Sequence, residues 1–168
     1  AGLSPLMMIA TWFEQRRHGT STDKAAVAAF RADLTSLIAD LHDEQEREIA
    51  VRLSEHPSAR ECLTAVHERR PLMWTRRPDS WGFLDLRLGL GTLPSRSVVK
   101  PVEGKGAPRD LVAEAQAQLE GCALVSGVPV VASPMETGAV GVAGPRSAAI
   151  ATARALVAQA AALHSPAE

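Results

Sequence analysis

The residues best suited to chemistry are arginines interleaved with tryptophans between residues 67 and 83. The segment reads HERRPLMWTRRPDSWGF, and its basic and large aromatic members are Arg69, Arg70, Trp74, Arg76, Arg77 and Trp81. Arginines among aromatic rings can bind phosphate and stack on bases, so nucleic-acid binding is one use of this pattern. Nearby acidic residues dilute the positive field, and two prolines stiffen the chain. We therefore expect a structural connector in which guanidinium groups stack on the tryptophan rings.

A glycine-rich turn at residues 141–147, GVAGPRS, is the second candidate, because it lies where a phosphate-binding loop could lie. Such a loop needs the spacing G-x-x-x-x-G-K-[ST]. Here the lysine is missing, and Pro145 lacks one N–H donor that a phosphate would use. We expect no bound cofactor, but a tight turn at Gly144 and a helix that starts at Pro145. The larger apolar anchors of that helix are Ile150, Leu156 and Leu163.

Metal and nucleophile chemistry find little support in the sequence. None of the histidines pairs with Cys62 or Cys122 at zinc-finger spacing, so we expect no metal site. Ser133, in ASPME, lacks the glycine-flanked elbow of a hydrolase, and we expect no catalytic residue. The two cysteines are typical of small buried residues in a reducing compartment. The five histidines are His18, His42, His56, His67 and His164.

The composition is that of a folded protein without a dominant charge. The chain has 168 residues, of which 46% are hydrophobic, enough for a real core. Its formal net charge is −1, so the chain as a whole has no attraction for nucleic acid or anionic lipid. Any such binding would need a local patch.

A long helix is expected from Ser21 to about His56. It carries an apolar stripe with alternating steps of three and four residues: Val27, Phe30, Leu34, Leu37 and Leu41. At about 1.5 Å per residue it would be roughly 50 Å long, which suits a stalk that packs on a second helix or on another copy. We expect residues 58–69 to form that second helix. Its expected apolar face is Cys62, Leu63 and Val66.

After Pro71 the pattern changes to short strands. Residues 82–91 alternate four leucines (Leu84, Leu86, Leu88 and Leu90) with polar residues and glycine, which predicts a half-buried strand. Arg87 lies on its polar side, from where it can reach back to the connector. Further strands are expected at 96–100, 123–127, 129–133 and 138–144, and a helix at 109–119. The fold class is therefore α+β: a long N-terminal helical stalk or hairpin, then a small β-containing unit closed by a C-terminal helix.

The first residues leave two interpretations open. Ala1–Phe13 is apolar, too short to cross a bilayer, and followed by Arg16 and Arg17. It could be the end of a transmembrane helix with its basic cytoplasmic flank, or an ordinary amphipathic terminus.

Two stretches resemble a known family. WTRRPDSWGFLDLRLGLGTLPS, residues 74–95, resembles a W-x-R-R-P, then F-L-x-L-R-x-G-x-G, pattern in the membrane-proximal part of actinobacterial FtsK/SpoIIIE-type ATPases, above all EccC of type VII secretion. GPRSAAIATARALVAQAAALHSPAE, residues 144–168, is similar to the element before their first ATPase-like domain. The link DSWG departs from the acidic, proline-containing link of many EccC sequences. Protein export and DNA transport by a related membrane-anchored translocase therefore both stay open.

The resemblance implies a division of the chain into three parts. Residues 1–20 would be a transmembrane remnant and cytoplasmic exit, 21–71 the stalk, and 72–168 a small α+β domain before the ATPase domains. The parent would be a hexameric ATPase anchored at the cytoplasmic face of the cell membrane, with its ATP and Mg sites beyond Glu168. Its partners would be its own copies and membrane-embedded secretion components, with DNA only in the alternative. The interface residues implied or expected are Trp74, Arg76, Arg77, Trp81 and Arg87 at the junction, and Leu34, Leu37 and Leu41 on the stalk.

Overall fold

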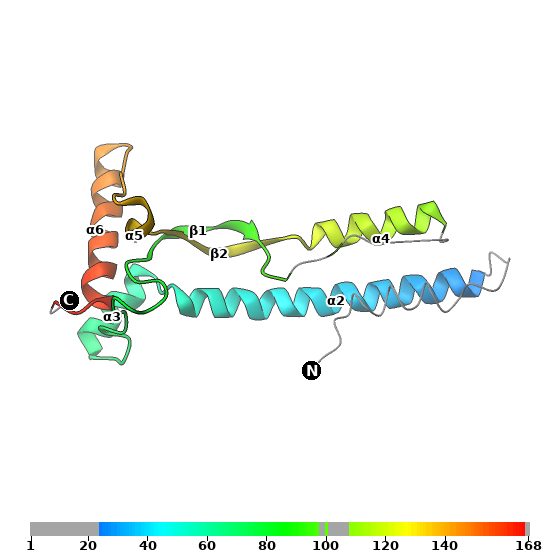
Figure 1. Ribbon diagram of the computed structural model, residues 1–168, viewed down its shortest axis with the longest axis horizontal. Helices are drawn as coiled ribbons and strands as arrows, with labels where there is room; N and C mark the ends of the chain where they lie inside the picture. Colours follow the sequence, from blue (N-terminus) through cyan, green and yellow to red (C-terminus); the bar gives the residue numbers. More distant parts are fainter. Residues whose placement is uncertain (1–23, 98–99, 101–107, 167–168) are drawn as a thin grey trace. The chain divides into compact units, whose positions relative to one another are not determined.

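The computed structural model describes residues 24–97, 100 and 108–166. Within them the elements are α2 (Lys24–Glu55), α3 (Ala59–Glu68), β1 (Leu86–Pro94), α4 (Arg109–Gly121), β2 (Leu124–Ala132), α5 (Pro134–Thr137) and α6 (Arg146–Leu163), as Figure 1 shows. β1 and β2 pair as an antiparallel two-stranded sheet. The predicted mixture of a long first helix, β structure and a C-terminal helix is confirmed.

The packed residues group into two compact units, each made from two separate stretches of chain. Unit 1 combines the described residues up to Glu48 with those of Pro94–Val125. Unit 2 combines Ile49–Leu93 with the described residues from Ser126 onward. This grouping does not test the expected division at residues 20 and 71, which stays a prediction.

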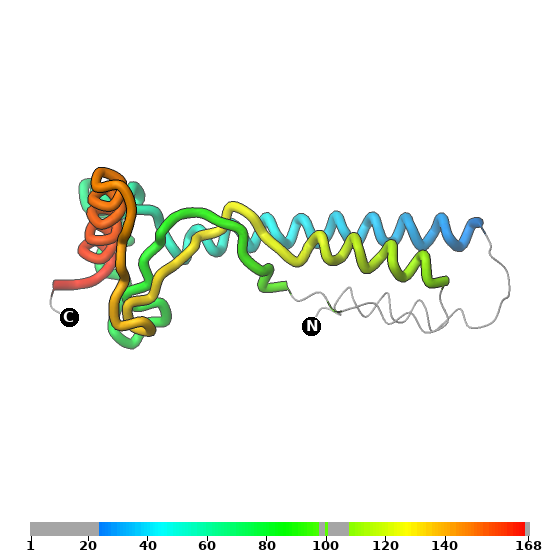
Figure 2. The backbone as a smooth tube through the Cα atoms, turned by 90° about the horizontal axis from the view of Figure 1, so that it is seen from above, coloured from blue at the N-terminus to red at the C-terminus, as the bar shows by residue number. Residues whose placement is uncertain are grey.

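In unit 1 the apolar stripe of α2 packs on α4, and Figures 1 and 2 both draw α4 alongside the N-terminal part of α2. Phe30 and Leu34 are each 3% exposed and form one cluster with Leu111 and Ala115 of α4. The stripe thus has a partner helix, as predicted, but that helix is α4. Alanine and leucine four residues apart on α4 form the ridge that the stripe covers.

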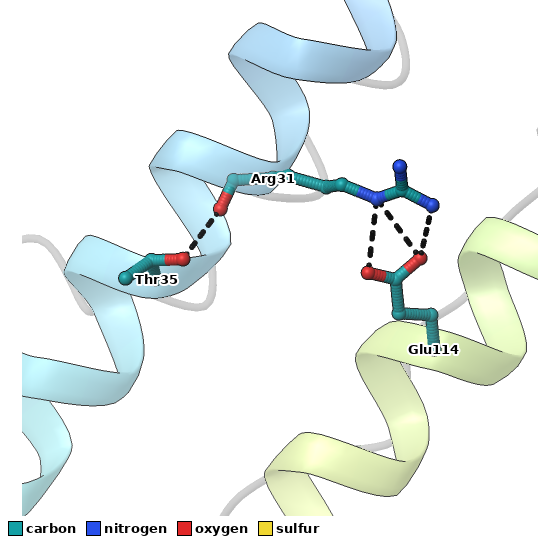
Figure 3. Close-up of polar contacts among 3 residues, drawn as sticks. All are labelled: Arg31, Thr35 and Glu114. Carbon is teal, nitrogen blue, oxygen red and sulfur yellow. Dashed lines mark hydrogen bonds and ion pairs between the residues drawn. The ribbon is translucent and has the colours of Figure 1, made fainter.

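Polar contacts within unit 1 join α2 to the later stretch. Arg31 makes a two-pronged ion pair with Glu114, with Nε–Oε1 3.1 Å and Nη2–Oε2 3.0 Å (Figure 3). Glu48 accepts hydrogen bonds from the Ser95 hydroxyl and the Arg96 N–H, at 2.7 and 2.9 Å. The bonds to Glu48 fix the chain just after β1 against α2.

In unit 2, α3 packs on α6 through small residues. Cys62, fully buried, lies in a cluster with Ala162 and Leu163. The predicted apolar face of α3 is wrong in part, because Leu63 is 57% exposed and Val66 is 44% exposed. The residues that α3 does bury are Cys62 and Ala65, whose small side chains allow an alanine-rich helix to approach closely.

The strand predictions need several corrections. β1 begins at Leu86 rather than at residue 82, because the Asp85 N–H bonds the Gly82 carbonyl at 3.1 Å and closes a turn there. Leu88 and Leu90 are exposed, since a two-stranded sheet gives its outer positions little cover.

The later strand candidates also change. Those at 123–127 and 129–133 are one strand, β2, and residues 138–144 form no strand. Arg96 and Ser97 lie in a bend, while residues 98 and 99 lie outside the described ranges.

Within the sheet, β1 and β2 approach closely at a glycine. A Cβ at Gly91 would lie 2.7 Å from Cγ2 of Val130, closer than packed carbon atoms come. Only glycine leaves room for Val130 over β1 at this point.

The C-terminal helix α6 begins at Arg146, after Gly144 with φ of +147° and Pro145 as its N-cap. This confirms the predicted turn at Gly144, while the helix begins one residue later than predicted, with Pro145 just before it. Leu156 and Leu163 are buried as expected, but Ile150 is 40% exposed and is no anchor. None of the described helices combines the length and apolar character that crossing a bilayer requires. Ala1–Phe13, the expected transmembrane remnant, lies outside the described residues.

Candidate functional site

Residues 74–87, here called the connector, lie in unit 2 and run along the end of α6. The Trp74 N–H donates to the Ala162 carbonyl and the Arg76 N–H to the Leu163 carbonyl, each at 2.9 Å. Arg76 and His164 also form an isolated parallel β-bridge. The main chain of the connector is thus bonded to the last carbonyls of α6, which lack partners inside their own helix.

Arg76 uses its side chain on the end of α2. Its Nη2 donates to the carbonyl of Glu55, the last residue of α2, and its Nη1 donates to the Trp81 carbonyl at 3.1 Å. The guanidinium carbon lies 5.1 Å from the centroid of the Trp81 ring. The predicted stacking of arginine on tryptophan is present for this pair.

Arg87 repeats the arrangement at the start of β1. Its N–H donates to Oε1 of Gln159 at 2.9 Å, and its carbonyl accepts from Nε2 of Gln159 at 3.0 Å. Its Nη1 donates to the carbonyl of His56, the residue after α2, at 3.2 Å. The guanidinium therefore reaches the end of α2.

The two arginines thus share one geometry: the main chain is bonded to α6 or its end, and the guanidinium is bonded to the end of α2. Helix C-termini carry unpaired carbonyls and a partial negative charge, which favours cations there. Pro57, two residues after the last residue of α2, prevents the chain from continuing the helix. The site is therefore a cationic cap that joins two helix ends.

The remaining predicted junction residues take lesser places. Trp81, 62% exposed, meets the His56 ring edge-on with centroids 6.0 Å apart. Trp74 contributes its main chain and leaves half of its side chain exposed. Arg77 is exposed, and within the described ranges its side chain makes no hydrogen bond or ion pair. Of these two neighbouring arginines, only Arg76 therefore contributes its side chain to the cap.

Sequence reasoning missed two residues of this site, Gln159 and His164. Gln159 is 2% exposed on the buried face of α6. The signal was its spacing, three residues after Leu156 and four before Leu163, which puts a polar side chain on the apolar face.

His164 holds the connector through its ring. Its Nε2 lies 3.0 Å from the Leu84 nitrogen and its Nδ1 lies 2.9 Å from the Ala160 carbonyl oxygen. Both bonds form only when the neutral imidazole carries its proton on Nδ1, so that Nε2 accepts from the Leu84 N–H. Phe83 packs edge-on against the ring at 5.0 Å.

The predicted stalk residues lie in the core of unit 1 or at its margin. Leu34 and Leu37 are 3% and 7% exposed, and Leu41 is half-buried. Leu34, together with Phe30, attaches α2 to Leu111 and Ala115 of α4. Burial leaves the leucines of this stripe little area for another copy.

The described part of the chain offers little reactive chemistry. No three histidine, cysteine, aspartate or glutamate side chains gather there in a way that suits a metal ion. Cys62 and Cys122 are free thiols, and burial raises the pKa of both, which disfavours the reactive thiolate. The expected lack of a metal or cofactor stays a prediction.

Comparison with known protein families and with curated proteins finds no match to this chain. The family resemblance therefore depends on the motifs in residues 74–95 and 144–168 and on the order of elements along the chain. Both stretches contribute to the cap: the first supplies its arginines, and the second supplies Gln159 and His164.

Proposed function

We propose that this chain is a non-catalytic stalk and assembly segment of a membrane-anchored FtsK/SpoIIIE-type ATPase, most like EccC of type VII secretion. One observation carries the proposal. Arg76 and Arg87, both within the motif that resembles this family, each bond the end of α2 through the guanidinium and the end region of α6 through the main chain.

This arrangement suits a structural segment that fixes the position of one domain relative to another. The recognisable arginines are occupied by main-chain carbonyls, so their charge and donors serve to join helix ends. In the proposed parent, α2 would lead from the membrane side and the chain after α6 would lead to the ATPase domains. The cap would then hold the motor at a defined place relative to the stalk. ATP, magnesium, the hexamer and the exported protein belong to that parent.

The test of this role uses the full-length parent ATPase in an actinobacterial cell that exports proteins by type VII secretion. Arg87→Ala should lower export at least severalfold while the ATPase stays in the membrane fraction at its normal amount. Arg77→Ala, at the exposed arginine, is the matched control and should export normally. Export unaffected by Arg87→Ala, or a parent protein found outside the membrane fraction, would contradict the proposal.

A second arm addresses the DNA-translocase alternative and nucleotide binding with this 168-residue chain. Duplex DNA binding that weakens steeply with salt and is lost in Arg69→Ala with Arg77→Ala would favour DNA transport. Calorimetry with ATP and magnesium should show no binding, because the turn at Gly144 lacks the motif lysine. Micromolar binding that Arg146→Ala removes would mean that the turn is a nucleotide site after all.

A further inference from the structure

The main chain of the connector turns left-handed at two residues that are not glycine. The φ angle is +55° at Trp74 and +59° at Leu84. Side chains disfavour this region because the Cβ atom crowds the carbonyl oxygen, so such residues persist only where their surroundings hold them. A third example, Arg69, is the C-cap of α3, where a left-handed residue is common.

The end of α6 holds both strained residues by their N–H groups. The Trp74 N–H donates to the Ala162 carbonyl at 2.9 Å. The Leu84 N–H donates to Nε2 of His164 at 3.0 Å. One acceptor belongs to the last turn of α6, and the other belongs to the first residue after it.

We propose that the end of α6 is a latch that keeps the connector in this strained form, and that opening the latch frees the end of α2. Arg76 follows Trp74 by two residues, and Arg87 follows Leu84 by three. A return of Trp74 or Leu84 to an ordinary negative φ redirects the chain that follows. The guanidinium groups then leave the carbonyls of Glu55 and His56. The inference stands on these contacts and does not depend on the proposed function.

His164 links the latch to the integrity of the helix. Its Nδ1 donates to the Ala160 carbonyl, one turn back in α6, while its Nε2 accepts from Leu84. Unwinding of the last turn removes the Ala160 carbonyl from Nδ1 and the Ala162 carbonyl from Trp74 together. Pulling on the chain beyond α6, or displacing its last turn, is therefore the event that opens the latch.

Amide hydrogen exchange, measured by NMR on the 168-residue chain, tests the latch. The reporters are the amides of Arg76, bonded to Leu163, and of His56, bonded to Arg52 in the last turn of α2. His164→Ala should speed exchange of both by about tenfold, the scale of one lost hydrogen bond in a local opening. The control is Val157→Ala. Val157 lies on α6 and is 68% exposed, so this variant should change the exchange of neither amide.

Two results decide this arm. The Ala149 amide, bonded to the Pro145 carbonyl at the other end of α6, should keep its protection in every variant, which shows that the helix is still folded away from the latch. Faster exchange at Leu84 alone, with Arg76 and His56 unchanged, would mean that His164 merely fills one hydrogen bond, and the latch would be overturned.

A pair of variants at Leu84 tests the strain itself and does not touch His164. Leu84→Gly and Leu84→Ala both remove the side chain, but only glycine adopts positive φ freely. Exchange at Arg76 should be slower in the glycine variant than in the alanine variant by about fivefold or more. Adding His164→Ala should then raise the exchange rate of the Arg76 amide less in the Leu84→Gly variant than in the chain with Leu84. Equal exchange in the glycine and alanine variants would show that no strain is held there and would overturn the proposal.

Discussion

Gln159 binds Arg87 as a neighbouring β-strand would, since its amide accepts from the Arg87 N–H at 2.9 Å and donates to the Arg87 carbonyl at 3.0 Å. The side chain is 2% exposed, so no water replaces it readily. Gln159→Leu keeps a similar volume and leaves two main-chain groups without these partners. We expect the free energy of unfolding to fall by about 1–3 kcal/mol in urea titration. Gln118→Leu, at an exposed glutamine on α4, should change it by less than about 0.5 kcal/mol. Equal effects at both positions would mean that the pairing adds no stability.

Lysine substitutions separate the arginine that caps α2 from the one that does not. Arg87→Lys keeps the charge but loses the planar fork that reaches His56, so we expect a loss of about 1 kcal/mol in stability. Arg77 was expected to play the same role, but its exposed side chain predicts a change near zero for Arg77→Lys. Thermal melts of both variants check this. A larger loss at Arg77 than at Arg87 would overturn the assignment of the cap.

The stripe of α2 should behave as a core. Leu34 is 3% exposed against α4, and Leu34→Ala should lower the free energy of unfolding by about 2–4 kcal/mol. Ser36→Ala, on the exposed side of the same helix, is the control. The melting temperature of the unsubstituted 168-residue chain should not depend on protein concentration. A melting temperature that rises with concentration and loses that dependence in Leu34→Ala would show that the stripe pairs between copies.

Acid should weaken the start of α3. The Ser58 hydroxyl and N–H both donate to the Glu61 carboxylate at 2.7 Å, and these bonds lower the pKa of Glu61. A lowered pKa means that the carboxylate stabilises the fold above its ordinary pKa of 4.5, and that this stabilisation disappears as pH falls through the lowered value. The difference in melting temperature between the unsubstituted chain and Glu61→Gln should be largest at neutral pH and should become smaller below about pH 4.5. The control is Glu136→Gln on α5, and a difference that does not vary with pH would contradict the prediction.

The sequence predicted local features well because they depend on neighbouring residues. The stripe at steps of three and four predicted α2, and glycine followed by proline predicted the turn before α6. Alternating leucines misled at residues 82–91, because Gly82 and Leu84 take left-handed conformations that no alternation pattern reveals. The exposure of Leu88 depends on the number of strands in the sheet, which a single strand does not encode.

Distant partners explain what was missed at the site. Stacking of Arg76 on Trp81 was foreseeable, since the two residues are close in the sequence. The acceptors at the end of α2 and the bonds from Gln159 and His164 were not. They join residues between 21 and 80 positions apart, and carbonyl acceptors leave no mark in a sequence. A buried glutamine between two leucines was the readable hint.

The pairing of α2 with α4 imposes an order on biosynthesis. Arg31 and Glu114 are 83 residues apart, so at about 5–20 residues per second a ribosome makes α2 several seconds before α4. During that interval Phe30 and Leu34 have no α4 to cover them. Chaperones bind apolar surface that is exposed in this way, so we expect a pause in translation between residues 55 and 109 to lengthen the time in which they can bind the nascent helix.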